Sequence, residues 1–208
     1  IATGLLLFGV VGEVAGFLLM RGINYRFAAV WGVATLALVC GALLMTLKLG
    51  IFSRGFAGDR SRKFIRAAYI WLLISLSMLI LLPVWQFLAL PVLAPESHAV
   101  EIGFSHAYYG AIRHAITVGF ISLMILGVGA RAIREIHAPE RATLTMLWLP
   151  FILVNTGCAM RVGFQTLTDV HTLAFPVAGV SGILELTGIS VWAVHLLGLM
   201  KESRAAKG

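Results

Sequence analysis

His114 has the residue type and position most suited to chemistry, because it lies within an apolar segment. Residues 113–131 read RHAITVGFISLMILGVGAR, with a basic residue at each end. An imidazole in hydrocarbon is costly unless it is hydrogen-bonded or bound to a metal. His114 is therefore the first candidate ligand for a haem or a metal ion. Arg113 beside it would pair with a haem propionate or a phosphate, or extend to the membrane interface.

Three further histidines could serve the same chemistry. His106 and His114 are eight positions apart, which on one helix is about 12 Å along the axis and a turn of roughly 80°. These two cannot both bind one small metal ion. His171 is expected at the depth of His106 on another span, which makes them the plausible pair across helices, and His195 is the last candidate. Two facing imidazoles would hold a haem, and several around a small cavity would hold copper.

Two carboxylates also lie within apolar segments. Glu13 is near the middle of the first span and Glu185 is near the middle of the last, so we expect them at similar depth. Such residues could share a proton or a cation and form a proton route. The alternative is a neutral, hydrogen-bonded carboxyl group that holds helices together, since GEVAG and GVSG nearby are typical of close helix packing.

The composition predicts the elements that must position these residues. Hydrophobic residues make up 60% of the chain, charged residues 12%, and the mean hydropathy is +0.95. Continuous apolar runs of about twenty residues are typical of transmembrane helices and are longer than barrel strands. We therefore predict an all-α, polytopic membrane helix bundle that forms one domain over residues 1–208. Six spans are expected, at residues 1–20, 27–47, 67–90, 107–130, 144–162 and 173–200.

Prolines indicate where these helices bend or end. Pro83 lies inside the third span, where it removes a backbone hydrogen bond and should kink the helix. Pro91 and Pro95 are expected to mark the exit from that span into a loop. Pro176 lies near the start of the sixth span, where it would either kink the helix or shape only its first turn.

The basic residues predict an orientation. They concentrate in the loops after the second and fourth spans and in the C-terminal tail, whereas the loop over residues 91–105 has none and contains two glutamates. Because positively charged loops stay in the cytoplasm, both termini are expected on the cytoplasmic side of a bacterial inner membrane. In this orientation the net charge of +7 attracts the chain to anionic headgroups of membrane lipids. Nucleic acid is not an expected partner. The basic residues on the predicted cytoplasmic side are Arg54, Arg60, Arg62, Lys63, Arg66, Arg131, Arg134, Arg141, Lys201, Arg204 and Lys207.

Several stretches of the chain resemble a known family. HAITVGFISLMILGVGAR at 114–131 resembles the histidine-bearing helix of the NnrS family, which are membrane haem–copper proteins associated with nitric-oxide metabolism. LWLPFILVNTGCAMRV at 147–162 and FPVAGVSGILELTGISVWAVHLLGL at 175–199 are similar to its later helices. The resemblance covers the C-terminal half of the chain. Family members commonly have more spans, and this chain begins inside an apolar run without Met, so we expect further sequence upstream.

The resemblance implies an integral membrane protein that binds a b-type haem, alone or with copper, and handles nitric oxide or transfers electrons. His114 is the best ligand candidate, with His106, His171 and His195 behind it. The family's Gly-His-Thr-Gly-Arg loop is replaced here by IREIHAPER, and no catalysed reaction is predicted.

The sequence also fits two other functions. The chain could be a cofactor-free accessory or anchor subunit whose histidines pack against other membrane subunits. It could also be a transporter of ions or small solutes, with Glu13, Glu185 and Arg113 along the path. No nucleotide-binding motif and no CxxCH motif for covalent haem is present.

Overall fold

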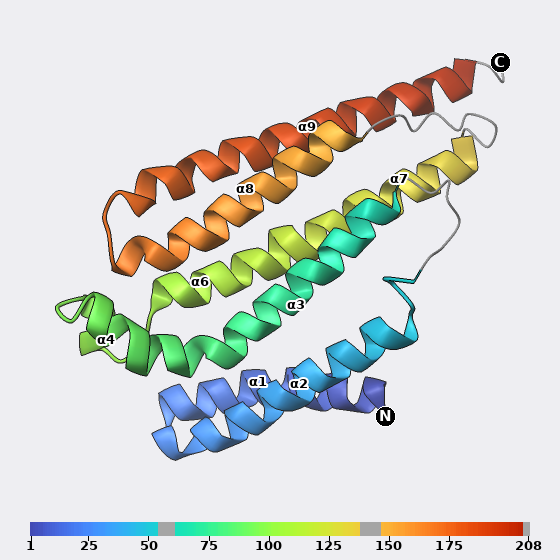
Figure 1. The fold of residues 1–208 in the computed structure, drawn as a ribbon. Helices are drawn as coiled ribbons and strands as arrows, with labels where there is room; N and C mark the ends of the chain where they lie inside the picture. The colour runs from blue at the N-terminus through green and yellow to red at the C-terminus, as the bar shows by residue number, and fades with distance from the viewer. Residues whose placement is uncertain (54–60, 138–146, 206–208) are drawn as a thin grey trace.

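The structure, a computed structural model, describes residues 1–53, 61–137 and 147–205, and every secondary-structure element within these ranges is helical. The long helices cross the molecule six times as three antiparallel pairs (Figure 1). This confirms the predicted all-α bundle. The pairs are α1 (Ala2–Gly22) with α2 (Ala28–Lys48); α3 (Arg62–Val84) with α6 (His106–His114), a π-helix (Ala115–Ser122) and α7 (Leu123–His137); and α8 (Trp148–Thr166) with α9 (Ala174–Ala205).

The three pairs form three layers. The pair of α3 with α6 and α7 lies in the middle, with α1 and α2 on one side and α8 and α9 on the other (Figure 1). Contacts of α2 with α3, of α6 with α8 and of α7 with α9 join the layers. Short helical turns occur at Tyr25–Phe27, Trp85–Ala89, Leu90–Leu93 (α4), His98–Glu101 (α5) and Leu167–Asp169.

Five helical stretches are long and apolar enough to cross a membrane. The sixth pass, α8, is long enough but less apolar, because it carries Asn155, Arg161 and Gln165. This helix corresponds to the predicted span 144–162, whose first three residues lie outside the described part. The five stretches are Ala2–Gly22, Tyr25–Lys48, Arg62–Leu93, His106–Ile133 and Ala174–Lys201.

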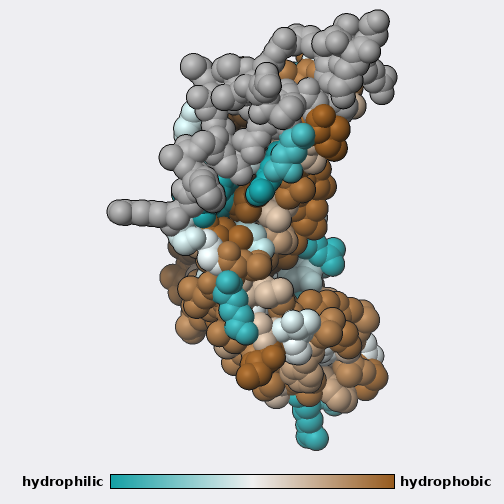
Figure 2. Space-filling view, turned by 90° about the vertical axis from the view of Figure 1, so that its right-hand side faces the viewer, coloured by the Kyte–Doolittle hydropathy of each residue, from teal (hydrophilic) through white to brown (hydrophobic). Residues whose placement is uncertain are grey.

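The outer surface of the bundle is apolar. Large aliphatic side chains on all three layers are more than half exposed, among them Val11, Val33 and Leu186. Figure 2 shows hydrophobic side chains over much of the described surface, with isolated hydrophilic ones between them. Such a surface is stable against lipid rather than water. The chain is therefore a multi-pass membrane protein whose helices contact lipid.

The helices change form or end close to the prolines that were predicted to bend or end them. Pro83 lies inside α3, and a π-helical turn, Trp85–Ala89, begins directly after it. Helical backbone then continues through Pro91 and ends at Leu93, so the exit lies between Pro91 and Pro95, the two prolines predicted to mark it. Pro176 lies in the first turn of α9, where its missing N–H would have had no helical partner. It shapes that turn and does not kink the helix.

Glycines allow the close approach of α1 and α2. A Cβ atom added at Gly9 would lie 2.5 Å from the backbone N and Cα of Leu38, which no side-chain movement can relieve. We therefore expect Gly9→Ala to push the two helices apart and to lower the unfolding free energy by about 1–3 kcal/mol. Thermal denaturation in detergent measures this. Gly4→Ala is the matched control, because nothing lies within 4 Å of its added Cβ, and equal destabilisation by both would contradict the argument.

Candidate functional site

A buried contact joins α6 to α9. His114 Nε2 lies 2.7 Å from Glu185 Oε1, the distance at which an N–H donates to a carboxylate. Only 20% of the His114 side chain and 10% of the Glu185 side chain are exposed. His114 ends α6, and Glu185 lies near the middle of α9. Two residues predicted separately as candidates thus form one hydrogen-bonded pair inside the bundle.

Small residues on α8 make room for this pair. A Cβ added at Gly157 would lie 2.6 Å from Glu185 Cγ and 2.8 Å from the carbonyl oxygen of Ser181. Cys158 and Ser181 are completely buried next to these residues. Because glycine alone leaves this space, α9 can approach α8 closely enough for Glu185 to reach His114.

The backbone changes its helical form at His114. The π-helix starts at Ala115 and runs to Ser122. Within it, Ser122 Oγ donates to the carbonyl oxygen of Thr117 at 3.0 Å, and Gly119 faces the ring of Trp71, whose Cγ would lie 2.5 Å from an added Cβ. Single π-helical turns inside α-helices occur frequently at functional sites. The irregular backbone beside a buried imidazole therefore supports a functional role for this region.

A second polar contact lies between α3 and α8. Trp71 Nε1 donates to Asn155 Oδ1 at 3.0 Å, and Asn155 Nδ2 donates to the carbonyl oxygen of Phe151 at 2.7 Å. Asn155 is on α8, less than one turn before Gly157. Asn155 is not among the residues predicted above, although an amide inside an apolar segment is the kind of signal that identifies such a residue.

The two intramembrane carboxylates do not meet. Glu13 on α1 accepts a hydrogen bond from Trp31 Nε1 on α2 at 3.3 Å. Glu185 is on α9, and the layer of α3, α6 and α7 separates it from α1 (Figure 1). The expectation that Glu13 and Glu185 share one proton or cation is therefore not met. Glu13 has its partner within the pair of α1 and α2, whereas Glu185 has its partner, His114, on α6.

The other candidate histidines have separate surroundings. His106 is exposed, with its ring edge-on to Phe104 at 4.9 Å between centroids. His171 is also exposed, and its Nδ1 accepts from the backbone N–H of Leu173 at 3.1 Å. The Nε2 atom of His195 is buried and has no hydrogen-bond partner among the residues described. No group of three or more His, Cys, Asp or Glu residues in the described ranges could hold a metal ion.

Arg113 lies at the surface rather than beside the buried pair. Its side chain is exposed, and the guanidinium carbon is 4.9 Å from the centre of the Tyr109 ring. This is a cation–π contact of the kind found at membrane interfaces. Both roles predicted for Arg113, pairing with a phosphate or propionate and extension to the interface, stay predictions.

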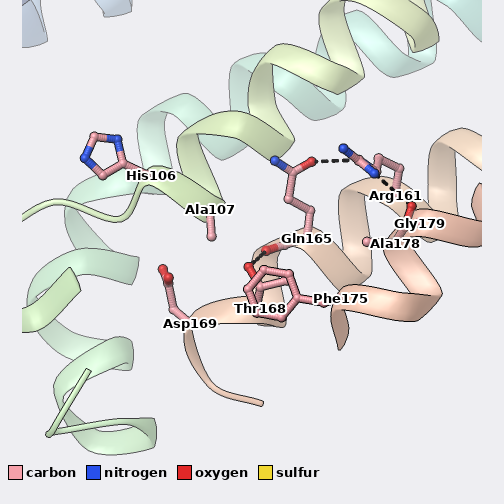
Figure 3. A pocket seen from close by; sticks show the side chains of 9 residues that line it. All are labelled: His106, Ala107, Arg161, Gln165, Thr168, Asp169, Phe175, Ala178 and Gly179. Atoms are coloured by element: carbon pink, nitrogen blue, oxygen red, sulfur yellow. Dashed lines mark hydrogen bonds between the residues drawn. The ribbon is translucent and has the colours of Figure 1, made fainter. Parts of the chain in front are cut away.

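A cavity lies between the end of α8, the start of α9 and the start of α6. Its volume is about 420 Å³, and Figure 3 shows that its polar side chains come mainly from α8 and the turn after it. Arg161 is the second-last residue of the predicted span 144–162 and lies inside α8, which continues to Thr166. Arg161, Gln165 and Asp169 recur every four residues, a spacing that places them on one helical face and could have revealed the cluster. The cavity is lined by His106, Ala107, Arg161, Gln165, Thr168, Asp169, Phe175, Ala178 and Gly179.

Comparison with protein-family models, with curated proteins and with solved structures finds no match to this chain. The fold class and the contacts described above are therefore derived from this chain alone and not from a similar protein.

Proposed function

We propose that this chain is an integral membrane protein that binds a b-type haem, as the NnrS family does, with His114 as the axial ligand. The observation that carries the proposal is the buried 2.7 Å contact between His114 Nε2 and Glu185 Oε1. A metal-binding histidine commonly donates its other ring N–H to a carboxylate, which fixes the tautomer and the orientation of the ring. Glu185 is placed to do this for His114.

The donor set supports a single imidazole ligand. With its proton on Nε2, His114 has Nδ1 as the nitrogen with a free lone pair, and no described residue hydrogen-bonds to that atom. Haem iron would supply binding of nitric oxide or transfer of electrons. The carboxylate of Glu185 would make the imidazole a stronger donor to the metal and would hold its N–H proton. No contact favours copper, because His106, His171 and His195 lie in separate surroundings.

The distribution of basic residues supports an orientation in a bacterial inner membrane. The start of α1, the end of α2, the start of α3, the end of α7 and the end of α9 lie at one end of the bundle (Figure 1). Lys48, Arg62, Lys63, Arg66 and Arg131 lie near that end, and we infer that it faces the cytoplasm. Of the basic residues that favoured this orientation in the sequence, Arg54, Arg60, Arg141 and Lys207 lie outside the described part.

One observation favours a second candidate function, that of a cofactor-free accessory or anchor subunit. The hydrogen bond between His114 and Glu185 already satisfies a buried polar atom on each side, as a purely structural pair would. The exposed apolar face of α1 and α2 would then contact other membrane subunits. An optical spectrum distinguishes the two functions.

The test is the haem content of the protein purified from its native membrane in mild detergent. We expect a Soret band, a b-type pyridine haemochrome and close to one haem per chain. His114→Ala should reduce haem content at least tenfold, because the axial ligand is lost, and the helical circular dichroism spectrum should remain. His98→Ala is the matched control, since His98 lies in an exposed pair with Glu101. A wild-type protein without haem would support the accessory-subunit function, and full haem in His114→Ala would exclude His114 as ligand.

A further inference from the structure

We propose that the cavity around Arg161 binds the headgroup of a phospholipid that carries both a phosphate and a primary ammonium group, such as phosphatidylethanolamine. This inference does not depend on haem binding. It rests on two opposite charges that line one cavity, on their order along the membrane normal, and on the lipid-facing side of the cavity.

Arg161 provides the positive charge. Its Nη1 donates to the carbonyl oxygen of Ala178 at 2.9 Å, and its Nε donates to Gln165 Oε1 at 3.2 Å. Both acceptors are neutral, and Arg161 forms no ion pair with any described residue. The side chain is partly buried, and a guanidinium inside a membrane span is costly without an anion. Its remaining N–H groups suit a phosphate, which guanidinium binds through two parallel hydrogen bonds.

Asp169 provides the negative charge at the outer end of the same cavity. Its Oδ2 accepts a hydrogen bond from Ser105 Oγ at 2.5 Å, which positions the carboxylate without neutralising it. In the described ranges no Lys, Arg or His pairs with Asp169. A free ammonium group offers three N–H donors and a positive charge, which is the complement that a carboxylate requires.

The two charges are separated along the bundle but are close enough for one headgroup. Arg161 reaches Gln165 Oε1, so its guanidinium lies near the level of Gln165, about one helical turn from the level of Asp169. In Figure 3 the Arg161 and Asp169 side chains lie on opposite sides of the cavity, with Gln165 and Thr168 between them. This spacing suits a phosphate and an amine joined by a short ethylene linker.

The order of the charges matches a lipid in a bilayer. Asp169 ends the short helical turn at the end of the bundle, whereas Arg161 lies deeper, inside α8. In phosphatidylethanolamine the phosphate is likewise deeper and the ammonium is further out.

The cavity is accessible from the lipid side. Phe175, one of its lining residues, is 61% exposed on α9, and nothing lies within 4 Å of a Cβ added at Gly179, another lining residue. An acyl chain could therefore continue from the headgroup along the apolar surface of α9. Ala107, Ala178 and Gly179 are small, which leaves the volume that the headgroup needs.

The experiment measures lipid retention by native mass spectrometry of the delipidated protein in detergent. Phosphatidylethanolamine, phosphatidylcholine and phosphatidylglycerol are added separately. We expect phosphatidylethanolamine to be retained about tenfold more than the other two, since each charged hydrogen bond contributes roughly one such factor. Arg161→Gln should abolish this retention. Asp169→Asn should remove the preference over phosphatidylcholine, whose quaternary ammonium cannot donate hydrogen bonds.

Two matched variants test the site without removing a charge. Gly179→Leu should block the cavity and reduce retention about tenfold, whereas Gly182→Leu, on the same helix and also open at its Cβ, should not. Circular dichroism and the elution profile check folding. Equal retention by the wild-type protein, Arg161→Gln and Gly179→Leu would overturn the proposal. Binding of soluble glycerophosphoethanolamine as tightly as the lipid would assign the site to a soluble zwitterion and overturn the lipid assignment.

Discussion

Replacing Glu185 with alanine should lower the unfolding free energy by about 1–2 kcal/mol, because it leaves Nε2 of the largely buried His114 side chain without its partner inside the bundle. Glu185→Gln should lose less than half of that, since its amide oxygen can still accept from Nε2–H. Thermal denaturation in detergent, followed by tryptophan fluorescence, measures both variants. Only 20% of the His114 side chain and 10% of the Glu185 side chain are exposed, and this burial is the reason that we expect a large effect.

The chain contains a matched control for this prediction. His98 and Glu101 form the same type of contact at 3.1 Å, but their side chains are 78% and 79% exposed. Exposed pairs contribute little because water solvates each partner. Glu101→Ala should therefore leave the thermal midpoint almost unchanged. If Glu101→Ala and Glu185→Ala were equally harmful, burial would not be what makes the His114 pair important.

Gly157→Ala should have the second large effect, a loss of about 1–3 kcal/mol from overpacking between α8 and α9. The added Cβ would lie 2.6 Å from Glu185 Cγ and 2.8 Å from the Ser181 carbonyl oxygen. The helices must separate to relieve these contacts, which moves Glu185 away from His114. We therefore expect a lower thermal midpoint and, in the haem-binding protein, a lower haem content, measured by denaturation and by the pyridine haemochrome.

Gly163 on the same helix provides the control for Gly157. Nothing lies within 4 Å of a Cβ added there, so Gly163→Ala should be neutral or slightly stabilising through the higher helix propensity of alanine. Normal stability and normal haem content in Gly157→Ala would show that α8 and α9 pack less closely than the structure describes.

Arg161 shows what a local pattern leaves out. The predicted span 144–162 ends one residue after Arg161. In the structure α8 continues to Thr166, because the guanidinium donates to the carbonyl oxygen of Ala178 on α9 and so has a partner within the bundle. That partner could not be predicted, since it depends on which helix lies beside α8.

The sequence by itself determined the class of fold, the approximate spans and the two residues at the centre of the site. Hydropathy is a local property, so an apolar run of about twenty residues predicts a membrane helix without knowledge of its neighbours. For the same reason, His114 and Glu185 could be recognised as polar groups that need partners. Only the tertiary structure decided that they pair with each other and that Glu13 pairs with Trp31. Pairing depends on which helices are adjacent and on how closely glycines such as Gly157 let them approach, and neither follows from the pattern of one helix.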